Sequence, residues 1–171
     1  MTSERAVAAA PIRVIFVCTG NSARSQMAEA ILRREGGEPF EVVSAGVDPR
    51  GVHPLTIRAL AEAGIDISGA RSKSVNEYVG QPFDYVVTVC DRARESCPYF
   101  PGGRETLHWG FDDPAEAEGS ESERLAGFER VLAEISHRVR TFVPFALKAH
   151  AAHVGSGAGA EGPDAVDASR Q

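Results

Sequence analysis

The chain alternates short apolar runs with longer segments in which apolar residues recur every three or four positions. The apolar runs lie at 12–17, 41–45, 84–89 and 105–108. Short runs that alternate with helical periodicity predict β-strands joined by helices, which is the pattern of a parallel sheet. We therefore expect an α/β fold, with a doubly wound, mostly parallel four-stranded sheet and helices on both faces.

Two of the helical segments have clear ends. The first follows Cys18 and stops at Gly36-Gly37, and its apolar face consists of Met27, Ala28, Ile31 and Leu32. The second begins at Pro54 and ends at Gly64, and its apolar face consists of Ile57, Leu60 and Ala61. Proline in the first turn and glycine after the last turn are typical helix boundaries.

The last helical segment is expected to close the domain. It opens with a capping box of Ser120 and Glu123, and its apolar positions are Leu125, Phe128, Leu132, Ile135 and Val139. Pro144 should stop it, because proline lacks the N–H that a helix interior needs. We thus divide the chain into a flexible segment 1–11, a domain 12–143, and an Ala/Gly-rich tail 144–171 that is expected to be disordered.

Composition narrows the possible partners and compartment. The 171 residues are 43% hydrophobic and 25% charged, and the net charge of -6 argues against binding to nucleic acid or an acidic membrane. The apolar run before Pro11 is too short for a signal peptide, and no later run could span a bilayer, so we expect a cytoplasmic monomer. In that reducing compartment the three cysteines are better explained as reactive thiols than as a disulfide framework.

The first apolar run ends on Cys18, and a turn of small residues leads from it to Arg24 at a helix start. Such a turn directs backbone N–H groups and the positive helix end toward one point, which favours a tetrahedral anion. The guanidinium of Arg24 can bond two oxygens of that anion, and the same field favours the nucleophilic thiolate of Cys18. The predicted oxyanion-binding residues are Thr19, Gly20, Asn21, Ser22, Ala23, Arg24 and Ser25.

Cys90 and Cys97 flank a short polar segment that follows the third predicted strand. If this segment is helical, the two residues lie about 10.5 Å apart along its axis. A disulfide needs Cα atoms within about 7 Å, so the two thiols could pair only if the segment unwinds. From the residues alone, a redox pair and two ordinary thiols near the core remain equally acceptable interpretations.

Several motifs together resemble one family. The stretch 17–29 (Val-Cys-Thr-Gly-Asn-Ser-Ala-Arg-Ser-Gln-Met-Ala-Glu), Ser44-Ala45-Gly46 and the stretch 109–114 (Trp-Gly-Phe-Asp-Asp-Pro) resemble the low-molecular-weight protein tyrosine phosphatase superfamily. Within it, the similarity is to the thioredoxin-coupled arsenate reductases, and it covers about residues 12–143.

This resemblance implies a function and a role for each residue. Cys18 would be the nucleophile, Cys90 and Cys97 the redox pair, and Asp113 the general acid, because the family's acid directly precedes a proline. Arsenate would be the substrate, with phosphate or sulfate as competing oxyanions, and the role would be arsenic detoxification and resistance. Thioredoxin would serve as an external reductant, with no bound cofactor and no catalytic metal.

Two departures from the family pattern refine this expectation. Ala23 stands where many relatives carry a second cysteine in the turn. Some members bind potassium through residues matching Asn21, Glu29 and Ser44 plus an aspartate, but Lys73 stands at that last position, so we expect its ammonium to replace the ion and pair with Glu29.

Two other functions remain as alternatives. A tyrosine phosphatase would use the same Cys18, Arg24 and Asp113 with water in place of Cys90. Against it, Ala115, Glu116 and Ala117 follow Pro114, where such phosphatases usually present aromatic residues to the substrate ring. An oxyanion-sensing module would need the same site without turnover, which the nucleophile, acid and extra thiols argue against.

Overall fold

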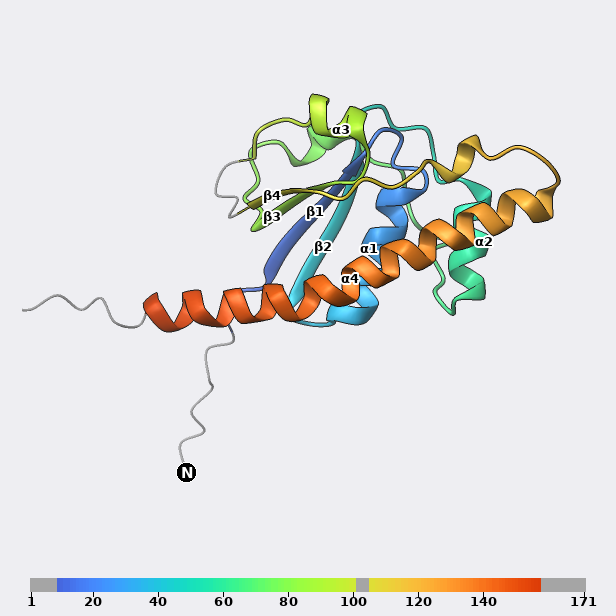
Figure 1. The fold of residues 1–171 in the computed structure, drawn as a ribbon. Helices are drawn as coiled ribbons and strands as arrows, with labels where there is room; N and C mark the ends of the chain where they lie inside the picture. Colours follow the sequence, from blue (N-terminus) through green and yellow to red (C-terminus); the bar gives the residue numbers. More distant parts are fainter. Residues whose placement is uncertain (1–8, 101–104, 158–171) are drawn as a thin grey trace, which may run out of the picture.

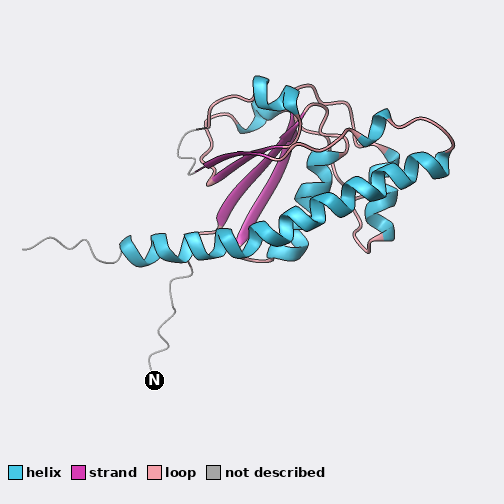
Figure 2. Cartoon of the chain, viewed as in Figure 1, coloured by secondary structure: helices cyan, strands magenta, loops and turns pink. Residues whose placement is uncertain are grey.

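A computed structural model describes residues 9–100 and 105–157. Figures 1 and 2 show a sheet partly enclosed by helices. In chain order the elements are β1 (Ile12–Cys18), α1 (Arg24–Gly36), β2 (Phe40–Gly46), α2 (Pro54–Glu62), η1 (Val75–Tyr78), β3 (Tyr85–Thr88), α3 (Asp91–Ser96), β4 (Glu105–His108), η2 (Pro114–Glu116) and α4 (Glu121–Gly157).

The four strands form one sheet in the order β2-β1-β3-β4, and all three pairings are parallel. The predicted strands and the α/β fold class are therefore confirmed. The register pairs Cys18 with Gly46, Val17 with Thr88, and Thr88 with His108. The carboxyl ends of all four strands thus meet at one edge, which is where a doubly wound sheet binds its ligands.

Helices α1 and α4 pack against each other along one face of the sheet (Figure 1). The crossover from β3 to β4 runs through α3, and the right-handed rule for such connections puts α3 on the opposite side from α1. There α3 contacts β1 and β3. Both faces of the sheet therefore carry helical segments, as the sequence predicts.

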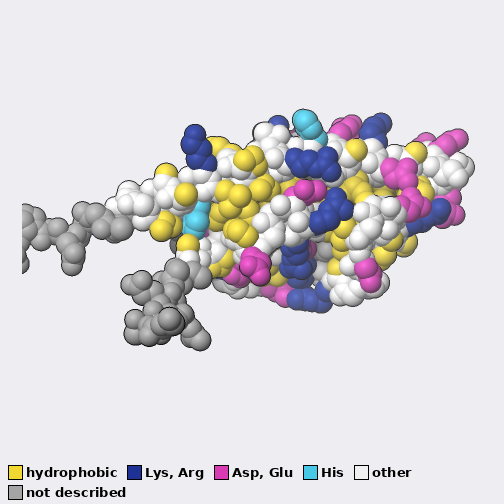
Figure 3. All heavy atoms as spheres, turned by 90° about the horizontal axis from the view of Figure 1, so that it is seen from below, with side chains coloured by type: hydrophobic (Ala, Val, Ile, Leu, Met, Phe, Trp, Pro, Cys, Tyr) yellow, Lys and Arg dark blue, Asp and Glu magenta, His cyan; other side chains and the backbone are white. Residues whose placement is uncertain are grey.

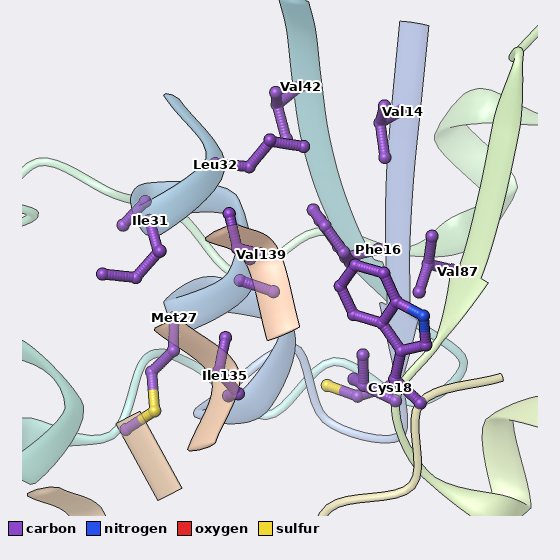
Figure 4. Packing of buried hydrophobic residues seen from close by; sticks show 14 of the residues in the cluster. Val14, Phe16, Cys18, Met27, Ile31, Leu32, Val42, Val87, Ile135 and Val139 are labelled. Carbon is purple, nitrogen blue, oxygen red and sulfur yellow. The ribbon is translucent and has the colours of Figure 1, made fainter. Parts of the chain in front are cut away.

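The core lies between β1, α1 and α4. Figure 4 shows Phe16 of β1, Ile31 of α1 and Val139 of α4 directed into this layer, and all three are fully buried. The predicted apolar faces of the first and last helices are confirmed. That of α2 is wrong in part: Ala61 is exposed and Ile57 only half-buried, whereas Leu55, Thr56, Ala59 and Leu60 are buried.

Helix α4 corrects the expected end of the domain, because it continues through Pro144 to Gly157. Phe142 and Ala146, on either side of Pro144, are both buried. The ring of Phe142 packs against those of Phe40, Tyr85 and Trp109. An apolar face that persists past the proline outweighs the hydrogen bond that the proline removes.

Beyond the contacts of Phe142, most of α4 is exposed to solvent. Phe145, Leu147 and Val154 are exposed on α4, and Figure 3 shows hydrophobic side chains open among charged ones on the face seen from below. Within the described parts of the chain, no helix has the length and apolarity to cross a membrane. The rest of the expected tail, 158–171, and most of the N-terminal segment, 1–8, lie outside the described residues.

Candidate active site

The loop between β1 and α1 is held from behind by the segment that follows β2. Backbone N–H groups of Val47, Asp48, Arg50 and His53 donate to the carbonyls of Cys18, Thr19, Gly20 and Ser22 at 2.8–3.1 Å. With these carbonyls engaged on one side, the loop can present N–H groups on the other. Gly46 permits this packing, since a Cβ there would lie 2.7 Å from the N of Asn21 and the O of Thr19.

Asn21 organises the floor of the loop. It is buried with a φ of 46°, the left-handed conformation that asparagine tolerates in tight turns. Its Nδ2 donates to Ser25 Oγ at 2.8 Å and to Ser44 Oγ at 2.9 Å. Its Oδ1 accepts from Gln26 Nε2 and from the N–H of Lys73, both at 2.9 Å. All four hydrogen-bonding positions of the amide are thereby satisfied, which fixes its orientation.

This orientation directs a proton toward Cys18. Because Ser25 Oγ accepts from Asn21, its own hydroxyl hydrogen is available to the sulfur of Cys18, 2.8 Å away. The backbone N–H of Asn21 donates to the same sulfur at 3.2 Å. The sulfur of Cys18 therefore has two hydrogen-bond donors directed at it, one from a side chain and one from the backbone.

Arg24, the first residue of α1, reaches across to the loop after β4. Its Nη1 donates to the carbonyl of Phe111 at 3.1 Å, and its Nη2 lies 3.5 Å from Asp113 Oδ2. The other oxygen of Asp113 accepts from the N–H of Ala115 at 3.0 Å and caps η2. Asp113 is therefore both a turn residue and a partner of Arg24.

These elements surround one cleft of about 600 Å³. Eight of the predicted site residues line it: Cys18, Thr19, Gly20, Ser22, Ala23, Arg24, Cys90 and Asp113. Ala115 and Glu116 line it as well. Asn21 and Ser25 lie buried beneath the cleft rather than in its wall.

The other two cysteines mark the two ends of α3. Cys90 caps its N-terminus, with its sulfur accepting from the N–H of Ala93 at 3.4 Å and lying 3.3 Å from Thr19 Oγ1. Cys97 is the C-terminal cap, does not line the cleft, and has its sulfur 3.6 Å from the carbonyl of Pro98. Burial raises the pKa of the Cys97 thiol to about 11. All three cysteines are free thiols in this structure.

The support behind the loop extends further than the local sequence pattern indicates. Ser44 Oγ donates to Glu29 Oε2 at 2.6 Å, which extends the network of Asn21 onto β2 and α1. Lys73 Nζ lies 3.9 Å from the same oxygen and donates to the carbonyl of Arg71 at 2.9 Å, so the expected pairing with Glu29 is confirmed. The pairing of β2 with β1 places Gly46 beside Cys18, and it therefore brings β2, which carries Ser44, next to the loop.

In the described ranges, no three His, Cys, Asp or Glu side chains gather as metal ligands would. The cleft itself offers a thiol, a guanidinium and loop amides, which are groups that bind and attack an oxyanion.

Comparison with known proteins assigns the chain to a family. Residues 13–153 match the profile of the low molecular weight phosphotyrosine protein phosphatase family. An arsenate reductase of Halalkalibacterium halodurans is 46% identical over 129 residues, covering 75% of this chain and 93% of that protein. This chain belongs to the low-molecular-weight phosphatase family. Within it, the chain is an enzyme of the arsenate reductase branch.

Solved structures agree with this placement. An arsenate reductase in a phosphate-binding state superposes with a TM-score of 0.67 at 30% identity, covering 77% of this chain and 96% of that one. A thioredoxin-dependent arsenate reductase of Corynebacterium glutamicum gives a TM-score of 0.63 at 31% identity, covering 84% of this chain and 65% of that one. The expected family and fold are thus confirmed.

Proposed function

We propose that this enzyme reduces arsenate to arsenite by passing oxidation along three thiols, from Cys18 to Cys90 to Cys97. The observation that carries the proposal is the placement of Cys90. Its sulfur lies on the wall of the cleft that holds Cys18, while Cys97 caps the far end of the same short helix. A hydrolytic phosphatase would need a water at the position that Cys90 occupies.

In the first step the Cys18 thiolate attacks arsenic. Arsenate would sit on the loop 19–25, with the guanidinium of Arg24 on two of its oxygens. A sulfur–arsenic bond forms as an arsenic–oxygen bond breaks, and Asp113 supplies the proton with which that oxygen leaves as water. Arg24 already contacts Asp113, so one residue holds the anion beside its proton donor.

In the second step Cys90 attacks the sulfur of Cys18. A disulfide forms between them, the sulfur–arsenic bond breaks, and its electron pair stays on arsenic, which leaves as arsenite. Cys97 then attacks Cys90 as a thiolate, the Cys18 thiolate departs, and the oxidation ends as a Cys90–Cys97 disulfide. Arsenic gains two electrons and two sulfurs lose one each, so the sequence balances.

The last exchange requires α3 to change shape. Six helical residues separate the caps, and a rise of about 1.5 Å per residue keeps the two Cα atoms beyond disulfide reach. Unwinding also exposes Cys97, whose half-buried thiol has its pKa raised by burial to about 11 and is a poor nucleophile until it is hydrated. The reduced helix thus restrains the third thiol until Cys90 has reacted.

The resulting disulfide needs an external dithiol for the next turnover. Thioredoxin is our candidate, because the Corynebacterium glutamicum relative is described as thioredoxin-dependent. It supplies two electrons by thiol–disulfide exchange, and no bound cofactor is required.

The decisive experiment measures NADPH consumption with thioredoxin, thioredoxin reductase and arsenate. The wild type should turn over repeatedly. Cys97→Ser should release about one arsenite per enzyme and then stall with Cys18 bonded to Cys90, whereas Cys90→Ser should release none. Both variants should retain hydrolysis of a small aryl phosphate, which needs only Cys18, Arg24 and Asp113, while Cys18→Ser should lose both activities.

Two results would contradict the relay. Repeated arsenate turnover in both the Cys90→Ser and Cys97→Ser variants would show that the second and third thiols are dispensable. Efficient aryl phosphate hydrolysis with no arsenate-dependent NADPH consumption in the wild type would favour the phosphatase alternative.

A further inference from the structure

His108 links the sheet to α3, the short helix that follows Cys90. It is the last residue of β4, and its register partner on β3 is Thr88, so the two side chains lie side by side. Its Nδ1 is 2.8 Å from Thr88 Oγ1, and its Nε2 is 3.1 Å from Asp91 Oδ1. Asp91 is the first residue of α3 and directly follows Cys90.

The geometry indicates which ring nitrogen faces which partner. A carboxylate only accepts hydrogen bonds, so Nε2 must carry the hydrogen that points to Asp91. The Thr88 hydroxyl can both donate and accept, and it satisfies Nδ1 whether or not that nitrogen carries a hydrogen. Thr88 is buried in the sheet, whereas the Asp91 side chain is 80% exposed. The imidazole thus anchors a surface residue to the rigid sheet.

Helix α3 needs such an anchor. A helix of six residues is too short to be stable by its own hydrogen bonds, so its position depends on contacts with the rest of the protein. Its other end must remain free to unwind if Cys97 is to reach Cys90. A contact at Asp91 restrains only the end that carries Cys90.

We propose that His108 is a positioning residue for Cys90, acting through Asp91. It holds the first turn of α3 against the sheet, so that Cys90 stays on the wall of the cleft that Cys18 also lines. This role rests on the proposed relay, in which Cys90 forms a disulfide with Cys18 and the electron pair of the broken sulfur–arsenic bond leaves on arsenic, in arsenite. His108 contacts neither arsenate nor a reacting sulfur.

Two substitutions of the same residue separate the two hydrogen bonds. The amide nitrogen of His108→Gln can occupy the place of Nε2 and still donate to Asp91. The shorter His108→Asn reaches only Thr88. If the anchor is what matters, single-turnover arsenite release should fall about tenfold or more in His108→Asn, as expected when a reacting group is displaced, and stay near wild type in His108→Gln.

A third substitution tests the partner. Asp91→Ala should slow arsenite release as much as His108→Asn does. The double variant that combines Asp91→Ala with His108→Asn should be no slower than either single variant, because each substitution removes the same contact. Hydrolysis of p-nitrophenyl phosphate reports Cys18 without Cys90, and it should be unchanged in His108→Asn and His108→Gln, because His108 does not line the cleft.

Each contrary outcome points to a definite conclusion. Wild-type arsenite release in His108→Asn, or additive losses in the double variant, would overturn the anchoring role. Equal losses of arsenite release and phosphate hydrolysis, with no rescue by His108→Gln, would show that His108 only supports the fold. If wild type itself releases arsenite while Cys90→Ser does so equally well, the relay fails first, and the role of His108 fails with it.

Discussion

The Nη2 atom of Arg24 lies 3.5 Å from Oδ2 of Asp113, which joins the start of α1 to the loop after β4. These residues come from opposite sides of the cleft, and both side chains are mostly buried, with exposed fractions of 12% and 33%. An oxyanion bound to Arg24 would therefore lie next to the carboxyl group of Asp113. In the proposed mechanism Asp113 is the proton donor, and a substitution can test that role.

Asp113→Asn should slow arsenate-dependent formation of the Cys18 adduct by about 10²–10⁴-fold, the usual effect of removing a general acid. Binding of arsenate should change little, because the amide still faces Arg24. Asp112→Asn is the matched control, since it alters the neighbouring exposed carboxylate and leaves the Arg24 contact intact. Equal losses in the two variants, measured by rapid quench, would contradict the assignment.

A second prediction concerns the hydroxyl of Ser25. It lies 2.8 Å from the sulfur of Cys18, and a hydrogen bond to a charged group contributes about 1.5–3 kcal/mol. Because the proposed mechanism has Cys18 attack arsenate through its sulfur, Ser25→Ala should slow arsenate-dependent formation of the Cys18 adduct about tenfold or more. Ser136→Ala, which removes a buried serine that bonds only within α4, should leave the rate unchanged. Equal losses in the two variants would contradict the role of the Ser25 hydroxyl.

Much of this arrangement could be predicted from sequence because its signals are local. The strand that ends on Cys18, the turn before Arg24 and the strand before Cys90 lie within single stretches of chain. The network of Asn21, Ser44 and Glu29 was harder to foresee, because it forms only once β2 pairs with β1. Pro144 was misread because a local rule predicts a stop, whereas burial of the residues around it decides the outcome.

That correction makes a stability prediction for α4. Phe142→Ala should lower the free energy of unfolding by about 3–5 kcal/mol, because it removes a buried ring that packs on the rings of Phe40, Tyr85 and Trp109, among others. Ending the chain after Leu147 should cost less than about 1 kcal/mol, since the residues of α4 beyond it are mostly exposed. Urea unfolding of both variants measures the two effects. A truncation as harmful as Phe142→Ala would mean that the end of α4 contributes to the core.

His53 gives a prediction on acid stability. Its Nδ1 accepts from the N–H of Leu55 and caps α2, so the capping nitrogen must be unprotonated. Burial, helped by the charge of Arg124 and opposed by that of Asp113, lowers the pKa of His53 below its ordinary value. The unfolded chain therefore takes up this proton first, and stability should fall as the pH drops below about 6.5. His53→Asn, which keeps a cap, should show a smaller loss between pH 7.5 and 5.5; an unchanged loss would exclude His53 as its source.

The last prediction concerns Lys73. Its ammonium lies 3.9 Å from Glu29 Oε2, and burial lowers its pKa despite the attraction of that carboxylate. Because a cation already neutralises Glu29, we expect no specific stabilisation by potassium: thermal melts in KCl and NaCl of equal ionic strength should coincide. Lys73→Asp replaces the cation with an aspartate and so completes the family's set of Asn21, Glu29, Ser44 and an aspartate; its melting temperature should become higher in KCl than in NaCl. A clear potassium preference in the wild type would show that Lys73 does not replace the ion.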